Sequence, residues 1–169
     1  MRDEKVFKLV RAALLAALCF VLTKVVAVPA PSGYVNLGDC AVLLSAWLMG
    51  PVYGGFAAGV GTALADILSG YASYAPGTFV VKLSMGAVAA FIFQRMERRN
   101  HLAAHLTGAI AAECVMVAGY FVYENLVLGV GLAAAASIFA NVVQGVFGVV
   151  TSVVLISALE KSQLTMLKG

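Results

Sequence analysis

Long apolar stretches, separated by short segments rich in polar residues, glycine or proline, make up most of this chain. Several approach or exceed the ~18 to 20 residues that an α-helix needs to cross a bilayer. Membrane-spanning helices are predicted at about residues 6–28, 38–49, 53–68, 78–94, 104–127 and 138–159. The second is only about 18 Å long at 1.5 Å per residue, because "GP" at Gly50 and Pro51 cuts it off. We therefore expect helices two and three to form a tight hairpin. The predicted fold is an all-α integral membrane bundle of six transmembrane helices, with residues 1–169 as a single domain.

The composition agrees with a hydrocarbon environment. Hydrophobic residues make up 62% of the chain and charged residues 11%, against about 25% charged residues in soluble domains. Little length remains for a soluble catalytic domain. The first apolar stretch is long and no small-residue cleavage site follows it, so we interpret it as a retained helix. Cys19, Cys40 and Cys114 lack the paired spacing of a zinc site or a disulfide framework, and we expect no metal and no cofactor.

The positions of the basic residues predict the orientation in the membrane. With six spans both termini share a side, and that side carries Arg2, Lys5, Lys8, Arg11, Arg95, Arg98, Arg99, Lys161 and Lys168. The three opposite connections, at about residues 29–37, 69–77 and 128–137, contain no Lys or Arg. By the positive-inside rule both termini are predicted to be cytoplasmic. The net charge of +3 therefore reports orientation and does not indicate nucleic-acid binding.

Polar side chains gather in the outer half of the predicted bundle. Buried ionisable groups cost several kcal/mol in hydrocarbon, so each one is a candidate functional residue. Tyr120 and Glu124 are four residues apart and share a helix face, and Asn141 and Gln144 are three apart. Because polarity is concentrated in one leaflet, an outward-facing pocket is favoured over a pore. The candidate binding residues are Asn36, Asp39, Lys82, Tyr120, Glu124, Asn141 and Gln144.

Most of these residues also have a structural interpretation. Asp39 is as well placed to cap the second helix as to contact a ligand. Lys82 either binds a ligand or pairs with Asp66 to neutralise both. Asn141 and Gln144 could hydrogen-bond between helices, although two amides one turn apart favour recognition. Glu113, nearer the midplane, is expected to be a structural hydrogen-bond partner.

Small residues also recur on the first helix. Ala12 with Ala16, and Ala13 with Ala17, are four residues apart, which would allow another helix to approach closely. Packing within this chain would explain the same pattern.

Taken together, "VNLGDCAVLLSAWLMGPVYGGFAAGVGTALADILSGYASYAPGTFVVK" and the later "ANVVQG" resemble the substrate-binding S components of energy-coupling factor (ECF) vitamin transporters, of the riboflavin and the pyridoxine or thiamine-pyrimidine types. The resemblance implies a six-helix protein of the bacterial plasma membrane that captures a water-soluble vitamin from outside. It further implies docking on a T component energised by two cytoplasmic ATPase subunits.

The residues that match the family's motifs acquire roles through this resemblance. Its alanine motif for contact with the T component matches Ala12, Ala13, Ala16 and Ala17. Its external-loop motif matches Asn36, Gly38 and Asp39, its helix-4 lysine matches Lys82, and its amide pair matches Asn141 and Gln144. The chain has no "GxxxxGK[ST]" phosphate loop, so energy must come from partners. The modest set of aromatic residues favours a small pyridine or pyrimidine ring, with riboflavin as the alternative.

Two other classes of protein compete with a transporter subunit. An enzyme would need a nucleophile with a base, or a metal cluster, but the two histidines, His101 and His105, fall in a basic connection predicted to be cytoplasmic. They are far from the outer polar cluster, so no enzymatic activity is expected. A structural or assembly protein would not need a one-sided array of amides, carboxylates and a lysine.

Overall fold

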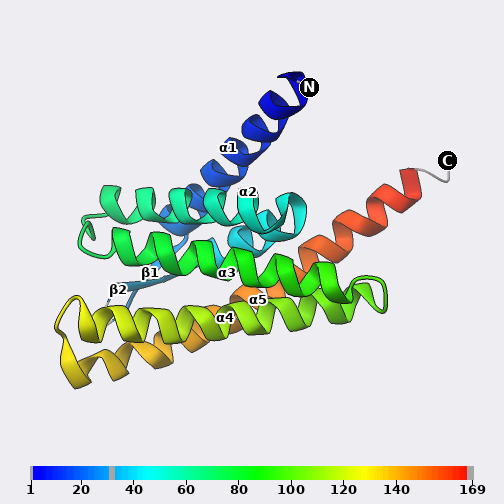
Figure 1. Cartoon of the computed structure of the whole chain (residues 1–169). Coiled ribbons are helices and arrows are strands. Elements are labelled where there is room, and N and C mark those ends of the chain that lie inside the picture. The colour runs from blue at the N-terminus through cyan, green and yellow to red at the C-terminus, as the bar shows by residue number, and fades with distance from the viewer. Residues whose placement is uncertain (1, 31–32, 167–169) are drawn as a thin grey trace.

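The computed structural model describes residues 2–30 and 33–166 and is almost entirely helical (Figure 1). Its elements, in chain order, are α1 (Arg2–Val25), β1 (Ala27–Ala30), β2 (Gly33–Asn36), α2 (Gly38–Leu68), α3 (Ala75–Met96), α4 (His101–Leu126), the short 3₁₀ helix η1 (Gly131–Ala134) and α5 (Ala135–Met166). Within this described part, five helices are long and apolar enough to cross a membrane. The predicted helical architecture is confirmed apart from the short β1–β2 hairpin, but five separate long helices replace the expected six, because α2 contains both the second and the third predicted spans.

A sharp break divides α2 into two arms, residues 38–49 and 51–68. Gly50 has φ 78° and ψ −178°, a conformation that favours glycine because it has no Cβ, and Pro51 then lacks the N–H that a continuous helix would need. Residues nine apart in a straight helix are separated by about 13 Å, yet a Cβ on Gly54 would overlap the backbone of Ser45. The two arms therefore fold back against each other.

The connections sort to two ends of the bundle (Figure 1). The terminal end, as we call it, carries the start of α1, the α3–α4 connection and the finish of α5; the opposite end carries the β1–β2 hairpin and the α2–α3 and α4–α5 connections. The basic α3–α4 connection thus lies at the same end as the basic start of α1. Lys168 and the side chain of Arg2 lie outside the described residues.

A two-stranded antiparallel hairpin occupies a segment that was predicted to be the end of the first helix and a loop. Its register pairs Ala27 with Asn36 and Pro29 with Tyr34. Helix α1 ends at Val25, ahead of Pro29, and a proline is tolerated at the edge of so small a sheet. The hairpin delivers Asn36 to the first turn of α2. The side chain of Tyr34 lies outside the described residues.

The core lies between the arms of α2 and the helices α3 and α4. Leu43, Met85, Met116 and Ala89 are fully buried there, and α1 and α5 pack on its sides. Large apolar side chains are exposed all along the outer faces, Leu14 and Phe139 among them. Such extensive exposed apolar surface is what a membrane environment would cover.

Candidate functional site

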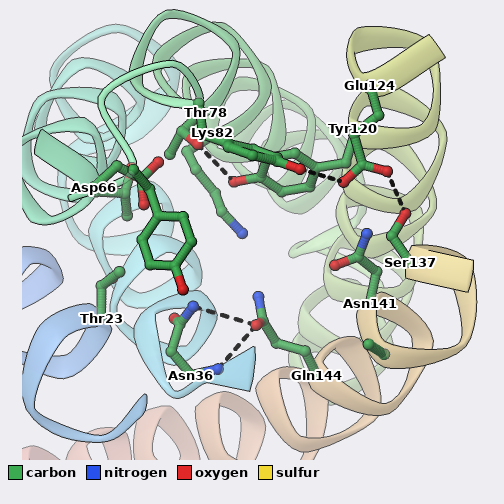
Figure 2. A pocket seen from close by; sticks show the side chains of 14 residues that line it. Thr23, Asn36, Asp66, Thr78, Lys82, Tyr120, Glu124, Ser137, Asn141 and Gln144 are labelled. Carbon is green, nitrogen blue, oxygen red and sulfur yellow. Dashed lines mark hydrogen bonds between the residues drawn. The ribbon is translucent and has the colours of Figure 1, made fainter. Parts of the chain in front are cut away.

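The protein has a polar cavity of about 60 Å³, whose lining side chains are drawn in Figure 2. Asn36 of the hairpin and Ser137 near the start of α5 line it, so it lies toward the end of the bundle opposite the terminal end. It is enclosed by α1, β2, α2, α3, α4 and α5, so residues far apart in the sequence meet around it. By volume it would admit a few water-sized groups. Its lining consists of Thr23, Asn36, Thr62, Asp66, Tyr71, Tyr74, Thr78, Lys82, Tyr120, Glu124, Ser137, Ala140, Asn141 and Gln144.

An ion pair supports one side of the cavity. The Nζ of Lys82 donates to Oδ1 of Asp39, and the Nε2 of Gln144 donates to Oδ2 of the same carboxylate at 2.6 Å. Asp39 is completely buried, and Lys82 and Gln144 nearly so. A carboxylate in such a place is tolerated only when its charge is paired and its oxygens are hydrogen-bonded. Asp39 thus lies behind the lining and fixes two side chains that belong to it.

For both residues the structure excludes one of the alternatives left open by the sequence. Lys82 pairs with Asp39 and not with Asp66, because the first turn of α2 faces α3 at the depth of Lys82. Asp39 does not cap α2 with its side chain: the capping residue is Leu37, without a side-chain hydrogen bond, and the backbone N–H of Gly38 donates instead to Oδ1 of Asn36 at 2.7 Å.

The hydrogen bonds continue from Gln144 to the hairpin. Its Oε1 accepts from the backbone N–H of Asn36 at 2.9 Å and from the Nδ2 of Asn36 at 3.2 Å, as Figure 2 shows. A Cβ at Gly38 would overlap both Oδ1 of Asn36 and Oγ1 of Thr23. Glycine at this position therefore lets α1, the hairpin and α2 meet beside the cavity.

Hydroxyl groups and a second carboxylate form the opposite side. Ser137 donates to Oε2 of Glu124 at 2.5 Å, and Tyr74 donates to Oε1 at 3.4 Å. Thr78 and Tyr120 are hydrogen-bonded through their hydroxyls at 3.1 Å, and the Nζ of Lys82 lies 5.5 Å from the centre of the Tyr120 ring. Burial of the Tyr74 phenol, together with the charge of Glu124, raises its pKa to about 12, so it remains a hydrogen-bond donor at neutral pH.

The lining includes polar groups that a ligand could use, on Asn141 and Thr23. Within the described part of the chain the side-chain amide of Asn141 has no hydrogen-bond partner, and Figure 2 shows it without one. The Oγ1 of Thr23 is buried and likewise has no partner among residues 2–30 and 33–166. Buried polar groups are usually satisfied, which makes Oγ1 of Thr23 a position where a bound molecule would be recognised, and the half-buried amide of Asn141 offers a donor and an acceptor beside the same cavity.

The structure brings six of the seven predicted residues into one lining, with Asp39 directly behind it. Prediction missed several hydroxyl groups and Asp66, although helical spacing carried a signal for them. Thr78 precedes Lys82 by four residues, and Ser137 precedes Asn141 by four. Residues at this spacing share a helix face, so Thr78 and Ser137 could have been predicted from their positions relative to Lys82 and Asn141.

A larger groove of about 640 Å³ lies between α4 and α5. Its lining is apolar except for Glu113, and it opens on the outer face of these helices, where Ile110 and Val146 are exposed. We therefore assign it to lipid contact. Neither carboxylate oxygen of Glu113 has a hydrogen-bond partner among the described residues, so its expected role as a structural hydrogen-bond partner was wrong.

The alanines of α1 divide between two environments. Ala13 and Ala17 are exposed, whereas Ala12 and Ala16 are half-buried. A Cβ on Gly61 would overlap the carbonyl oxygen of Ala16, so the second arm of α2 packs closely on this side of α1. The outward-facing part of the alanine pattern is therefore Ala13 and Ala17.

A bundle of membrane-length helices around a small cavity with fixed donors and acceptors defines a membrane protein that binds a small polar molecule. The family model of ECF-type riboflavin transporter S components matches residues 4–161, and the chain belongs to this family. S components are multi-pass membrane proteins and subunits of vitamin transporters, not enzymes. Membership implies partnership with an ECF T component and ATPase subunits, and a vitamin substrate.

Proteins similar to the chain include two curated relatives and a solved structure. An uncharacterised protein of Pyrococcus woesei is 37% identical over 123 residues, covering 73% of this chain and 80% of the relative. The thiamine precursor transporter HmpT of Lactococcus lactis subsp. cremoris (strain MG1363) is 30% identical over 96% of this chain and 93% of the relative. The S component of a bacterial ECF transporter superposes with a TM-score of 0.70 at 21% identity, covering 94% of this chain and 98% of that one, which supports the fold.

Proposed function

We propose that this chain is the substrate-binding subunit of an ECF importer and captures a small heterocyclic vitamin or precursor, of the thiamine-pyrimidine or pyridoxine type, in the cavity of Figure 2. The observation that carries the proposal is that polar groups of Asn141 and Thr23 without hydrogen-bond partners among the described residues belong to a lining whose other polar side chains are largely hydrogen-bonded to one another. A site with fixed donors and acceptors discriminates strongly against analogues that leave one of them unpaired.

The small size of the cavity favours a single ring over a flavin, and lining side chains must move outward to admit even that ring. The cavity volume is about 60 Å³, and the charge of Lys82 is already neutralised by Asp39, which leaves Asp66 and Glu124 as further acidic groups in the lining. Carboxylate oxygens accept hydrogen bonds, so amino and hydroxyl donors on a pyrimidine or pyridine would suit them. The similarity to HmpT over nearly the whole chain agrees with this ligand class.

Riboflavin is the second candidate, because the matching family model is described by that substrate. A flavin would need a longer and flatter space between aromatic side chains. Of the lining residues, Tyr71, Tyr74 and Tyr120 are aromatic, and the first two contact each other edge to face with ring centroids 6.3 Å apart. These two rings are therefore nearly perpendicular and do not form a parallel pair that could enclose a flat three-ring system.

The proposed topology has six crossings with both termini in the cytoplasm. The two arms of α2 supply two crossings and the other four long helices one each. The ends seen in Figure 1 support this assignment, since the basic α3–α4 connection lies with the start of α1 and the finish of α5. By the positive-inside rule this end would be cytoplasmic, and the cavity would then open to the outside.

Docking on the T component is proposed to use α1. Its exposed alanines, Ala13 and Ala17, leave room for close approach of a partner helix. Ala12 and Ala16 would support that surface from the side that packs on α2.

Calorimetric titration of the detergent-solubilised protein with thiamine pyrimidine, pyridoxine and riboflavin tests the ligand class. Calorimetry is preferable to tryptophan quenching, because Trp47, the one tryptophan in the sequence, contacts His105 far from the cavity. The small rings should bind and riboflavin should not. Loss of one hydrogen bond in Asn141→Ala should cost about 0.5–1.5 kcal/mol, a roughly 2- to 12-fold rise in Kd.

Gln94→Ala serves as the matched control, since Gln94 is an exposed amide of α3 outside the cavity lining. Its affinity should equal that of the wild type. Wild-type affinity of Asn141→Ala for the ligand that binds would place the site elsewhere, and binding of riboflavin alone would select the second candidate.

A further inference from the structure

A cluster of three metal-ligating side chains lies away from the vitamin pocket. His101 and His105 belong to the first two turns of α4, not to a loop as the sequence suggested, and Glu160 lies in the last part of α5. The Nε2 of His105 is 3.0 Å and the Nδ1 of His101 is 3.5 Å from Oε1 of Glu160. These helix segments meet at the terminal end in Figure 1.

The spacing of the three ligand atoms fits one small metal ion. Two histidines four residues apart share a helix face, and all three candidate ligand atoms lie within 4.8 Å of one another. In a tetrahedral zinc site with bonds of about 2.0–2.1 Å, neighbouring ligand atoms are separated by roughly 3.3 Å. The two His–Glu separations are close to this value, so an ion needs only small side-chain adjustments to enter.

The surroundings hold one ligand rigidly and leave the other two accessible. The His105 ring is stacked on Phe93, with ring centroids 4.3 Å apart, and meets the edge of Trp47 at 4.4 Å. Its side chain is 1% exposed, whereas the side chains of His101 and Glu160 are 60% and 37% exposed. An ion could therefore enter from solvent, and a water molecule could complete its coordination.

From this geometry we propose that His101, His105 and Glu160 bind one divalent transition-metal ion of the borderline class that prefers imidazole and carboxylate ligands, such as Zn²⁺. The ion would join the start of α4 to the end of α5, at the opposite end of the bundle from the cavity. An ordinary hydrogen bond between histidine and glutamate would give the same contacts without a metal ion. A direct measurement of metal binding distinguishes the two cases.

The test is titration of the full-length, tag-free protein in detergent with Co²⁺, followed by visible absorption and then by competition with Zn²⁺. The chain contains only these two histidines, so imidazole ligation reports this site. A Cys114→Ser background removes the exposed thiol. We expect one equivalent of Co²⁺, with the visible absorption of a four- or five-coordinate site, no thiolate charge-transfer band, and displacement by Zn²⁺.

Variants identify the ligands. His101→Ala and Glu160→Gln should each weaken Co²⁺ binding by at least about tenfold, since even the loss of a residue that only supports a ligand has an effect of that size. Both residues are partly exposed, so these variants should fold even if a change at the buried His105 does not. Glu97→Gln, in the α3–α4 connection, is the matched control and should bind as the wild type.

Thermal stability gives a second reading of the same site. ZnCl₂ should raise the Tm of the wild type and of Glu97→Gln but not that of His101→Ala. Absence of Co²⁺ binding at millimolar concentration, or unchanged affinity in both ligand variants, would show that the cluster is only a hydrogen-bonded contact.

Discussion

The ion pair between Lys82 and Asp39 should be the most sensitive point of the bundle. Asp39 is completely buried, and Lys82 is one of two side chains that satisfy it. Replacing one partner of a buried pair leaves an uncompensated charge and typically costs about 3–5 kcal/mol. We expect Lys82→Met to lower the free energy of unfolding by this amount.

A second substitution should restore most of that loss. In Lys82→Met with Asp39→Asn, position 39 is neutral and its amide oxygen can still accept from Gln144. The coupling energy in the double-mutant cycle should be about 2–3 kcal/mol. Equilibrium unfolding in mixed detergent micelles, followed by circular dichroism, measures all four proteins.

The matched double-mutant cycle uses Asp66, which the sequence analysis considered as a partner of Lys82 because the two residues were predicted to lie at similar depth in the membrane. Lys82→Met and Asp66→Asn should be nearly additive, with a coupling energy below about 0.5 kcal/mol. A larger coupling to Asp66 than to Asp39 would refute the assignment of the pair. Additivity in both cycles would show that the charge of Lys82 has no specific partner.

Three further outcomes are expected. Bulky substitution of Ala13 and Ala17 should abolish vitamin uptake by the assembled transporter without changing the Kd of the isolated subunit for its ligand. If uptake and ligand affinity are lost together, this face of α1 packs within the subunit and does not contact a partner. In a cysteine-free background, a cysteine at Ser73 should react with an impermeant reagent only from outside, and labelling only from inside would overturn the proposed topology. Because burial raises the pKa of Tyr74 to about 12, the unfolded phenol ionises first and stability should fall between about pH 10 and 12; Tyr74→Phe should remove that part of the pH dependence.

Hydropathy predicted the helices well because hydrocarbon imposes a length on them. The observed bounds of α3 and α4 lie within three residues of the predicted ones. The β1–β2 hairpin was missed, since it is outside the apolar stretches and its pairing depends on two four-residue segments with a weak pattern. The sharp break at Gly50 was foreseen because glycine followed by proline has a direct conformational meaning.

The sequence predicted how deep each candidate residue lies along its helix, but not which neighbour its side chain faces. The positions of Lys82, Asp39 and Asp66 along their helices could be estimated from the hydropathy pattern. Which carboxylate faces the lysine depends on how α2 and α3 are rotated about their own axes, and the pattern does not contain that information. Hydroxyl residues give still less signal, because they commonly bond their own helix, as Thr62 does to the carbonyl of Ala58 at 2.7 Å. A residue of this kind is recognised only once its neighbours on the same face are known.

The hydrogen bonds that link Lys82, Asp39, Gln144, Asn36 and Gly38 all point toward Asp39, since each donor lies on the side away from its carboxylate. The ammonium group can only donate, so Asp39 only accepts; the amide nitrogen of Gln144 must then point to Asp39 and its oxygen to Asn36. Each amide has a single permitted orientation, because the carboxylate of Asp39 can only accept while the backbone N–H groups of Asn36 and Gly38 can only donate. An incoming ligand meets dipoles that are already aligned, and its binding includes no penalty for turning them. With a neutral residue at position 39, the backbone N–H groups of Asn36 and Gly38 would still hold both amide oxygens in place, so such a variant should keep its selectivity among ring analogues.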